Sequence, residues 1–168
     1  MRRKREESGA ALVEFALLLP VFMALILGMF SGGVAYNQKL DLTHATREGA
    51  RYGATVAVTN QFANGQNWAS NVRDLIIDRA SGDLSGTGTG VCVALVSGTA
   101  ASTAAIDSNH TTAGGTSPCY TDNSADAGRR VQVSASKPSK IEALFFSWGI
   151  TLNAKAVSRY ECQASTCQ

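Results

Sequence analysis

The feature that most constrains this chain is a stretch without charge near its N-terminus. Residues 15–38, FALLLPVFMALILGMFSGGVAYNQ, contain no Asp, Glu, Lys or Arg. As an α-helix, a stretch of this length reaches about 36 Å at about 1.5 Å per residue. The hydrocarbon core of a bilayer is about 30 Å thick. We therefore expect one membrane span here, and a wholly soluble globular protein is not expected.

The charges of the chain are distributed unevenly. Residues 1–9 hold four basic and two acidic side chains, and the remaining chain holds 11 of each sign, so the formal net charge is +2. A basic flank favours the cytoplasmic side of a membrane, so we expect the N-terminus there and the larger C-terminal part outside. Because no basic excess remains after residue 9, a nucleic-acid partner is not expected.

Three interpretations of the apolar stretch remain open from the residues alone. It could be a secretory signal peptide cleaved after Ala35, although its apolar part is longer than the usual 7 to 15 residues. It could be a plain, uncleaved membrane anchor. The third interpretation is a helix for subunit assembly, and it rests on one acidic residue, Glu14.

Glu14 places a carboxylate at the edge of the apolar stretch, which costs about 2.5–3.5 kcal/mol at mid-membrane and less near an interface. Cleavage after Gly9 would create a new α-amine on Ala10, and Glu14 of one subunit could then pair with the amine of a neighbour. Alternatively, Glu14 lies at the headgroup level close to the leader and needs no partner. Spacing alone leaves both alternatives open.

The leader, Gly9, the apolar run and Glu14 together resemble a type IV prepilin signal, which prepilin peptidase cleaves on the cytoplasmic side. The Glu14-Phe15 pair looks like the Glu-Tyr/Phe variant of the Tad (tight adherence, Flp-type) pilus system. Residues 45–54, ATREGARYGA, are similar to the A-x-R-E-G-A-R-Y-A/G-A stretch of TadE-like proteins. The resemblance is weaker over residues 130–161.

This resemblance implies a minor pilin or pseudopilin that helps to assemble a pilus used in adhesion. It implies processing between Gly9 and Ala10, with Glu14 and Phe15 setting the register between subunits. It also implies a single-pass protein of the bacterial inner membrane, either retained there or incorporated in the pilus. The implied partners are prepilin peptidase, other pilins, inner-membrane assembly proteins and membrane lipid.

Small residues recur at every fourth position along the predicted helix 10–58. The upper ridge consists of Ala24, Gly28 and Gly32, and the lower ridge of Ala45, Gly49, Gly53 and Ala57. Such ridges allow another helix to approach closely. We favour packing between subunits, and packing against the chain's own domain is the alternative. Pro20 is expected to kink the helix near residues 16–20.

The chain divides into a leader at 1–9, the long helix at 10–58 and an extracytoplasmic domain at 59–168. In that domain, hydrophobic spacing predicts a turn at 60–66, helices at 67–80 and 138–148 and strands at 91–97, 130–136 and 151–160. A polar, low-complexity loop is expected within 81–128. The predicted fold is α+β, with a small antiparallel sheet packed on the end of the long helix.

All four cysteines follow the span, where disulfides can persist. Three pairings are possible, and we favour Cys92–Cys119 and Cys162–Cys167. The cysteine spacing is a poor match to a zinc site, so no metal is expected.

Catalysis and a cofactor are not expected either. His44 and His110 have no convincing catalytic partner in the sequence, and the glycine-rich run 86–90 does not open a helix as a phosphate loop does. Lys137 and Lys140 near Phe145, Phe146 and Trp148 could touch a membrane, but a core helix with solvated lysines is the simpler interpretation.

Overall fold

The computed structural model describes residues 3–58, 67–80, 84, 87–97, 100–101, 118–121, 128–143 and 146–161. The predicted turn at 60–66, His110, Cys162 and Cys167 lie outside these residues. The chain divides into two compact units, and each is described by itself. Unit 1 contains residues 1–37 and 139–150, and unit 2 contains residues 38–138 and 151–168.

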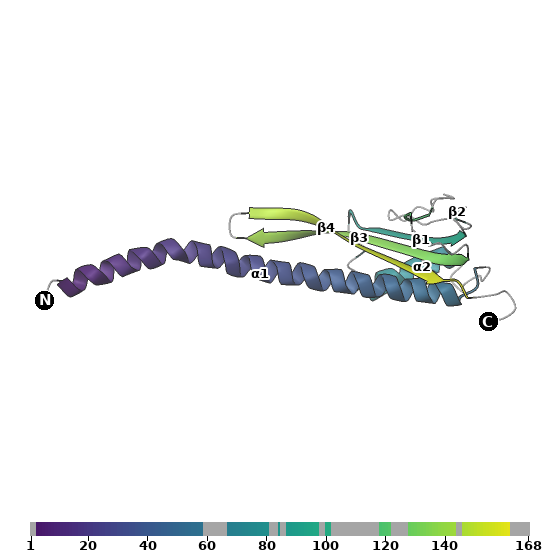
Figure 1. Ribbon diagram of the computed structural model, residues 1–168, viewed down its shortest axis with the longest axis horizontal. Coiled ribbons are helices and arrows are strands. Elements are labelled where there is room, and N and C mark those ends of the chain that lie inside the picture. Colours follow the sequence, from purple (N-terminus) through teal and green to yellow (C-terminus); the bar gives the residue numbers. More distant parts are fainter. Residues whose placement is uncertain are drawn as a thin grey trace. The chain divides into compact units, whose positions relative to one another are not determined.

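The first element is a single long helix, α1 (Arg3–Thr55), of 53 residues. It contains Pro20 and continues through it, and its ribbon bends within its first third (Figure 1). The helix tolerates this proline because an N-terminal stretch of strong helix formers such as Ala and Leu surrounds it. At its C-terminal end α1 stops at Thr55, shortly before the predicted boundary at residue 58.

The second helix, α2 (Trp68–Arg79), confirms the helix predicted at 67–80. The side chain of Asn67 caps it by accepting a hydrogen bond of 2.9 Å from the backbone N–H of Ser70, which satisfies one of the free donors of the first turn. Trp68, Val72 and Ile76 recur at every fourth position and are buried together on one side of the helix. Through this apolar stripe α2 packs against the rest of unit 2.

The sheet has four strands in the order β2-β1-β3-β4 (Figure 1). The strands are β1 (Gly90–Ser97), β2 (Ala100–Ala101), β3 (Arg129–Ala143) and β4 (Phe146–Arg159). β1 pairs antiparallel with both β2 and β3. The register places Val93 opposite Val133 and Leu95 opposite Val131, so that the apolar side chains of both strands share one face. The predicted α+β class with an antiparallel sheet is confirmed.

The main core of unit 2 lies between this face of the sheet and the helices. Its buried members come from the C-terminal part of α1, from α2 and the residues that follow it, and from β1, β3 and β4: Leu42, Ala45, Ala50, Ala54, Trp68, Ala69, Val72, Ile76, Ala80, Leu84, Val91, Val93, Leu95, Val131, Val133, Ala135 and Ala154. Alanines dominate the contribution of α1, which lets the helix axis lie close to the sheet. The predicted packing of the sheet on the end of the long helix is thereby confirmed.

A smaller cluster occupies the opposite side of the sheet. Ala94 and Val96 of β1 are buried there, next to the disulfide between Cys92 and Cys119. This bridge confirms one of the two predicted pairings. The adjacent Tyr120 donates a hydrogen bond of 2.9 Å from its hydroxyl to the carbonyl of Ala156 on β4. The segment around Cys119 is therefore attached to both β1 and β4.

The predicted helix at 138–148 is wrong. The structure has the end of β3 and the start of β4 there, joined across residues 144–145. From Phe146 onward, apolar side chains alternate with small or polar ones as far as Ala156, which is the period of a strand. This alternation outweighed the short hydrophobic run that suggested a helix.

We expect the Cys92–Cys119 bridge to stabilise unit 2 by about 2–4 kcal/mol, because it closes a loop of 27 residues in the unfolded chain. The double variant Cys92→Ala, Cys119→Ala should therefore unfold at lower denaturant concentration than the parent chain. The measurement is near-UV circular dichroism in detergent during a urea titration. Cys162→Ala with Cys167→Ala is the matched control, and an equal midpoint for parent and Cys92 variant would contradict the prediction.

Candidate functional site

The proposed processing site lies at the start of the described side chains of α1. Gly9 and Ala10 are both exposed, and a methyl group added at Gly9 would meet nothing within 4 Å. Among the residues that the structure describes, no neighbour explains the glycine, in contrast to the buried glycines described below.

Glu14 and Phe15 are exposed on the next turn, with 62% of Phe15 accessible. Glu14 has no ion-pair partner among the side chains that the structure describes. A carboxylate next to an apolar helix is costly unless a headgroup or an opposite charge compensates it. Within this part of the chain nothing does so.

The apolar part of α1 exposes its large side chains, while its small residues Ala24, Gly28 and Gly32 are half-buried. Large hydrophobic residues at least 40% accessible are Leu12, Val13, Phe15, Leu17, Leu18, Leu19, Val21, Phe22, Met23, Leu25, Ile26, Leu27, Met29, Phe30 and Val34. A helix that is apolar on every side belongs in a membrane or inside an assembly. Among the described residues one helix is long and apolar enough to span a membrane, and it is compatible with a single-pass anchor.

The lower small-residue ridge is used inside unit 2. A methyl group added at Gly49 would lie 2.6 Å from Ile76 Cδ1, which is far too close. At Gly53 it would lie 3.1 Å from both Trp68 Cζ2 and Val72 Cγ2. The indole N–H of Trp68 also donates a hydrogen bond of 3.0 Å to the carbonyl of Gly53. Glycine is required here because α2 packs directly on the backbone of α1.

The interpretation that we favoured from the sequence, packing between subunits, is therefore replaced for Ala45, Gly49 and Gly53. Ala45 is 1% accessible in the core of the chain's own unit, and α2 occupies the space beside both glycines. The upper ridge differs. Methyl groups added at Gly28 and Gly32 would meet nothing within 4 Å, so packing within the described chain does not require these two glycines.

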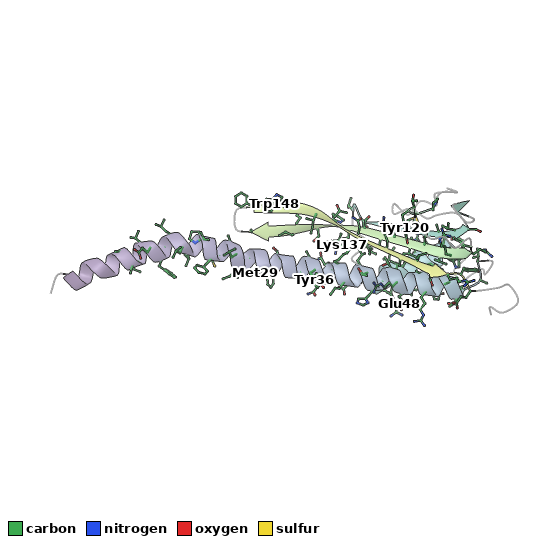
Figure 2. The ribbon with its side chains drawn as sticks, in the orientation of Figure 1. Met29, Tyr36, Glu48, Tyr120, Lys137 and Trp148 are labelled. Carbon is green, nitrogen blue, oxygen red and sulfur yellow. A yellow bond between two sulfur atoms is a disulfide. The ribbon has the colours of Figure 1, made fainter. Side chains whose placement is uncertain are left out.

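The charged residues of the ATREGARYGA motif face away from this core, whereas the polar Thr46 is buried. Arg47, Glu48 and Arg51 are exposed, and Glu48 forms an ion pair of 3.2 Å with Arg79 of α2. Glu48 can be followed on α1 in Figure 2. Arg47 and Arg51 line a shallow groove of about 380 Å³ between α1 and the end of β4. The motif thus combines a packing side with a charged outer side.

The last described residues, Tyr160 and Glu161, form hydrogen bonds with the C-terminal end of α1. The backbone N–H of Glu161 donates to the carbonyl of Ala54 at 3.1 Å, and the Tyr160 hydroxyl donates to the carbonyl of Val56 at 3.2 Å. The backbone N–H of Val58 donates to the same hydroxyl at 3.1 Å. Carbonyl groups that the helix leaves without partners at its end are satisfied in this way.

Sequence reasoning missed these tail contacts and the exposed hairpin end at residues 139–150. No local pattern signals the Tyr160 contacts, because they join residues about a hundred positions apart. The hairpin had a signal in the alternation that begins at Phe146. His44 is exposed on α1, and no cluster of three metal-ligating side chains occurs in the described parts of the chain.

The comparison with known families matches one segment of the chain, within α1. Residues 9–51 match the family model for TadE-like protein. The match confirms, over this segment of the chain, the resemblance noted in the sequence. The TadE-like segment begins at the exposed Gly9 and ends within the buried motif, so it covers both the open and the packed part of α1. No curated protein and no solved structure matches the chain.

We expect Gly49→Leu to destabilise unit 2 by about 1–3 kcal/mol, since the larger side chain must displace Ile76 in a filled core. Leucine favours helix more than glycine does, so a loss of stability would report packing and not helix propensity. The matched control is Gly28→Leu in the same helix, which should leave the urea midpoint of unit 2 unchanged. Equal midpoints for the two variants would show that the close approach at Gly49 is unimportant.

Proposed function

We propose that this chain is a minor pilin or pseudopilin of a Tad (Flp-type) pilus system. In this proposal, prepilin peptidase cleaves it after Gly9 in the inner membrane, and its role is structural, not enzymatic. The observation that carries the proposal is the family-model match, because it begins at Gly9 and follows the apolar helix. The exposure of the Gly9–Ala10 bond supports the same role.

The two parts of α1 support a division of labour within the subunit. Residues 38–55 pack into unit 2 through Ala45, Gly49 and Gly53, so this stretch has little small-residue surface left for another subunit. The large apolar side chains up to Val34 are exposed, and methyl groups added at Gly28 and Gly32 would meet nothing within 4 Å. We therefore assign the contacts between subunits to the apolar part of α1. Residues 38–55 instead connect this part to the folded domain of the same subunit.

Glu14 is assigned to setting the register between subunits. After cleavage, the amine of Ala10 and the carboxylate of Glu14 would be opposite charges on the same exposed helix end. Within one helix the two are four residues apart, but the amine of one chain can equally meet the carboxylate of its neighbour. A charge pair in a low-dielectric surrounding is stabilising relative to either charge alone, and this favours one axial position of the neighbour.

Processing is tested by the mass and N-terminal sequence of the chain recovered from membranes of its native host. We expect the mature chain to start at Ala10, because a side chain larger than hydrogen would block close approach of the peptidase to the Gly9 backbone. Gly9→Val should accordingly leave the leader attached. A start at Met1 would indicate an uncleaved anchored scaffold, and a start at Tyr36 would indicate a secreted domain. Either start would overturn the proposal.

Assembly is tested by replacing Glu14 with its uncharged isostere. We expect Glu14→Gln to leave the protein in the membrane fraction but to remove most surface pili, counted by electron microscopy, because the amine of the neighbour loses its charge partner. Asp41→Asn is the matched control, since Asp41 is also an exposed carboxylate on α1 and has no assigned role. Normal piliation in the Glu14 variant would contradict the assignment of Glu14.

A further inference from the structure

The end of the β3–β4 hairpin lies against the apolar helix within unit 1. Ser31 of α1 donates a hydrogen bond of 2.8 Å from its hydroxyl to the carbonyl of Glu142 at the end of β3. The same hydroxyl also lies 3.2 Å from the carbonyl of Gly28, one turn back. Residues 139–150 and residues 1–37 form one compact unit. The hairpin end is therefore fixed at the level of Ser31.

Two large aromatic side chains are exposed at this hairpin end. Phe146 is 65% accessible and Trp148 is 67% accessible, and their rings stack with centroids 6.2 Å apart. Figure 2 shows Trp148 at the free end of the hairpin, pointing away from the strands. Adjacent exposed aromatics form an apolar patch, and such a patch marks a surface that is covered in the working state. The core helix expected here from the sequence, in which these rings would be buried, does not form.

The level of Ser31 along α1 identifies what covers the patch. About 20 apolar residues cross a hydrocarbon core, so a span that begins at Phe15, directly after Glu14, ends near Val34, within one helical turn of Ser31. Tyr36, which follows by little more than one helical turn, is 64% accessible and labelled in Figure 2. Trp and Tyr concentrate where the hydrocarbon meets the headgroups. Trp148 and Tyr36 therefore belong to the same boundary layer.

We propose that the hairpin end is a second membrane contact, in which Phe146 and Trp148 insert into the headgroup boundary of the leaflet at the C-terminal end of the span. The occupant of the patch is lipid, because the patch is continuous, through the Ser31–Glu142 contact, with a helix that is apolar on all sides. Lys140 is exposed on the same hairpin end and suits anionic headgroups.

The insertion is shallow, for two physical reasons. Strand ends have backbone groups that need hydrogen-bond partners, and the hydrocarbon core offers none. Glu142 is also exposed, and its carboxylate must stay among the headgroups or in water. This inference goes beyond the proposed pilus role, since it concerns how the membrane holds the subunit and not what the subunit assembles into.

The test uses the full chain reconstituted in vesicles of phosphatidylcholine and phosphatidylglycerol that contain brominated lipid, a quencher of tryptophan fluorescence. The chain has two tryptophans, and Trp68 is 2% accessible in the core of unit 2. We expect lipids brominated near the headgroup to remove most of the Trp148 emission and lipids brominated near the chain end to remove much less. In Trp148→Phe, the remaining Trp68 emission should be unaffected by either lipid.

A second variant separates failure of the hairpin contact from failure of the span. Phe22→Trp in the Trp148→Phe background reports the middle of α1 and should be quenched most by bromine near the chain end. If that residue is quenched and Trp148 is instead quenched by aqueous iodide, the hairpin contact is wrong while the span stands. If Trp148 is shielded from iodide only at high protein density and bromine has no effect, a second copy covers it, and the lipid assignment is overturned.

Discussion

The packing of unit 2 depends on the close approach of α2 to the backbone of α1 at Gly49 and Gly53. A methyl group at Gly49 would overlap Ile76, and at Gly53 it would lie only 3.1 Å from Trp68 and Val72, so side chains at these positions would push the two helices apart. At that separation the carbonyl of Gly53 accepts the indole N–H of Trp68, which gives the largest side chain of the core a hydrogen-bond partner. The sheet then closes over both helices with Val131 and Val133.

The end of α1 is held from a second direction by the last described residues. The backbone of Glu161 and the hydroxyl of Tyr160 satisfy groups at and just after the helix terminus, while Arg129 lies over the Tyr160 ring at 4.8 Å. These contacts join the last residues of the sheet to the helix that begins the chain. Residues 38–55 of α1 thus belong to the domain, whereas the apolar residues before them contribute nothing to the core of unit 2.

The same helix consequently obeys two different constraints along its length. In the apolar part, what matters is the absence of charge, because lipid or another apolar helix must surround every side of it. In the packed part, what matters is side-chain size, because α2 contacts one side of the helix backbone. Glu14 breaks the first constraint, and in a helix so uniformly apolar such an exception calls for an assigned partner. The aromatic hairpin end extends the apolar surface beyond the helix itself.

The sequence by itself determined the features that follow from local pattern. The uncharged run predicted the long helix, and helical spacing of apolar residues predicted α2. A short apolar run predicted the strand around Val93, alternation predicted the strand around Val133, and a strand was also expected around Ala154. The cysteine positions favoured the Cys92–Cys119 bridge. Only the tertiary structure decided that the lower small-residue ridge packs against α2 of the same chain. The sequence could not, because a ridge of small residues allows close packing with a helix of the same chain or of another chain. The tertiary structure also decided that residues 138–148 form a hairpin and not a core helix. Pairing of the two strands gives their backbone N–H and C=O groups hydrogen-bond partners on the other strand. The residues of a short local segment do not reveal this stabilisation.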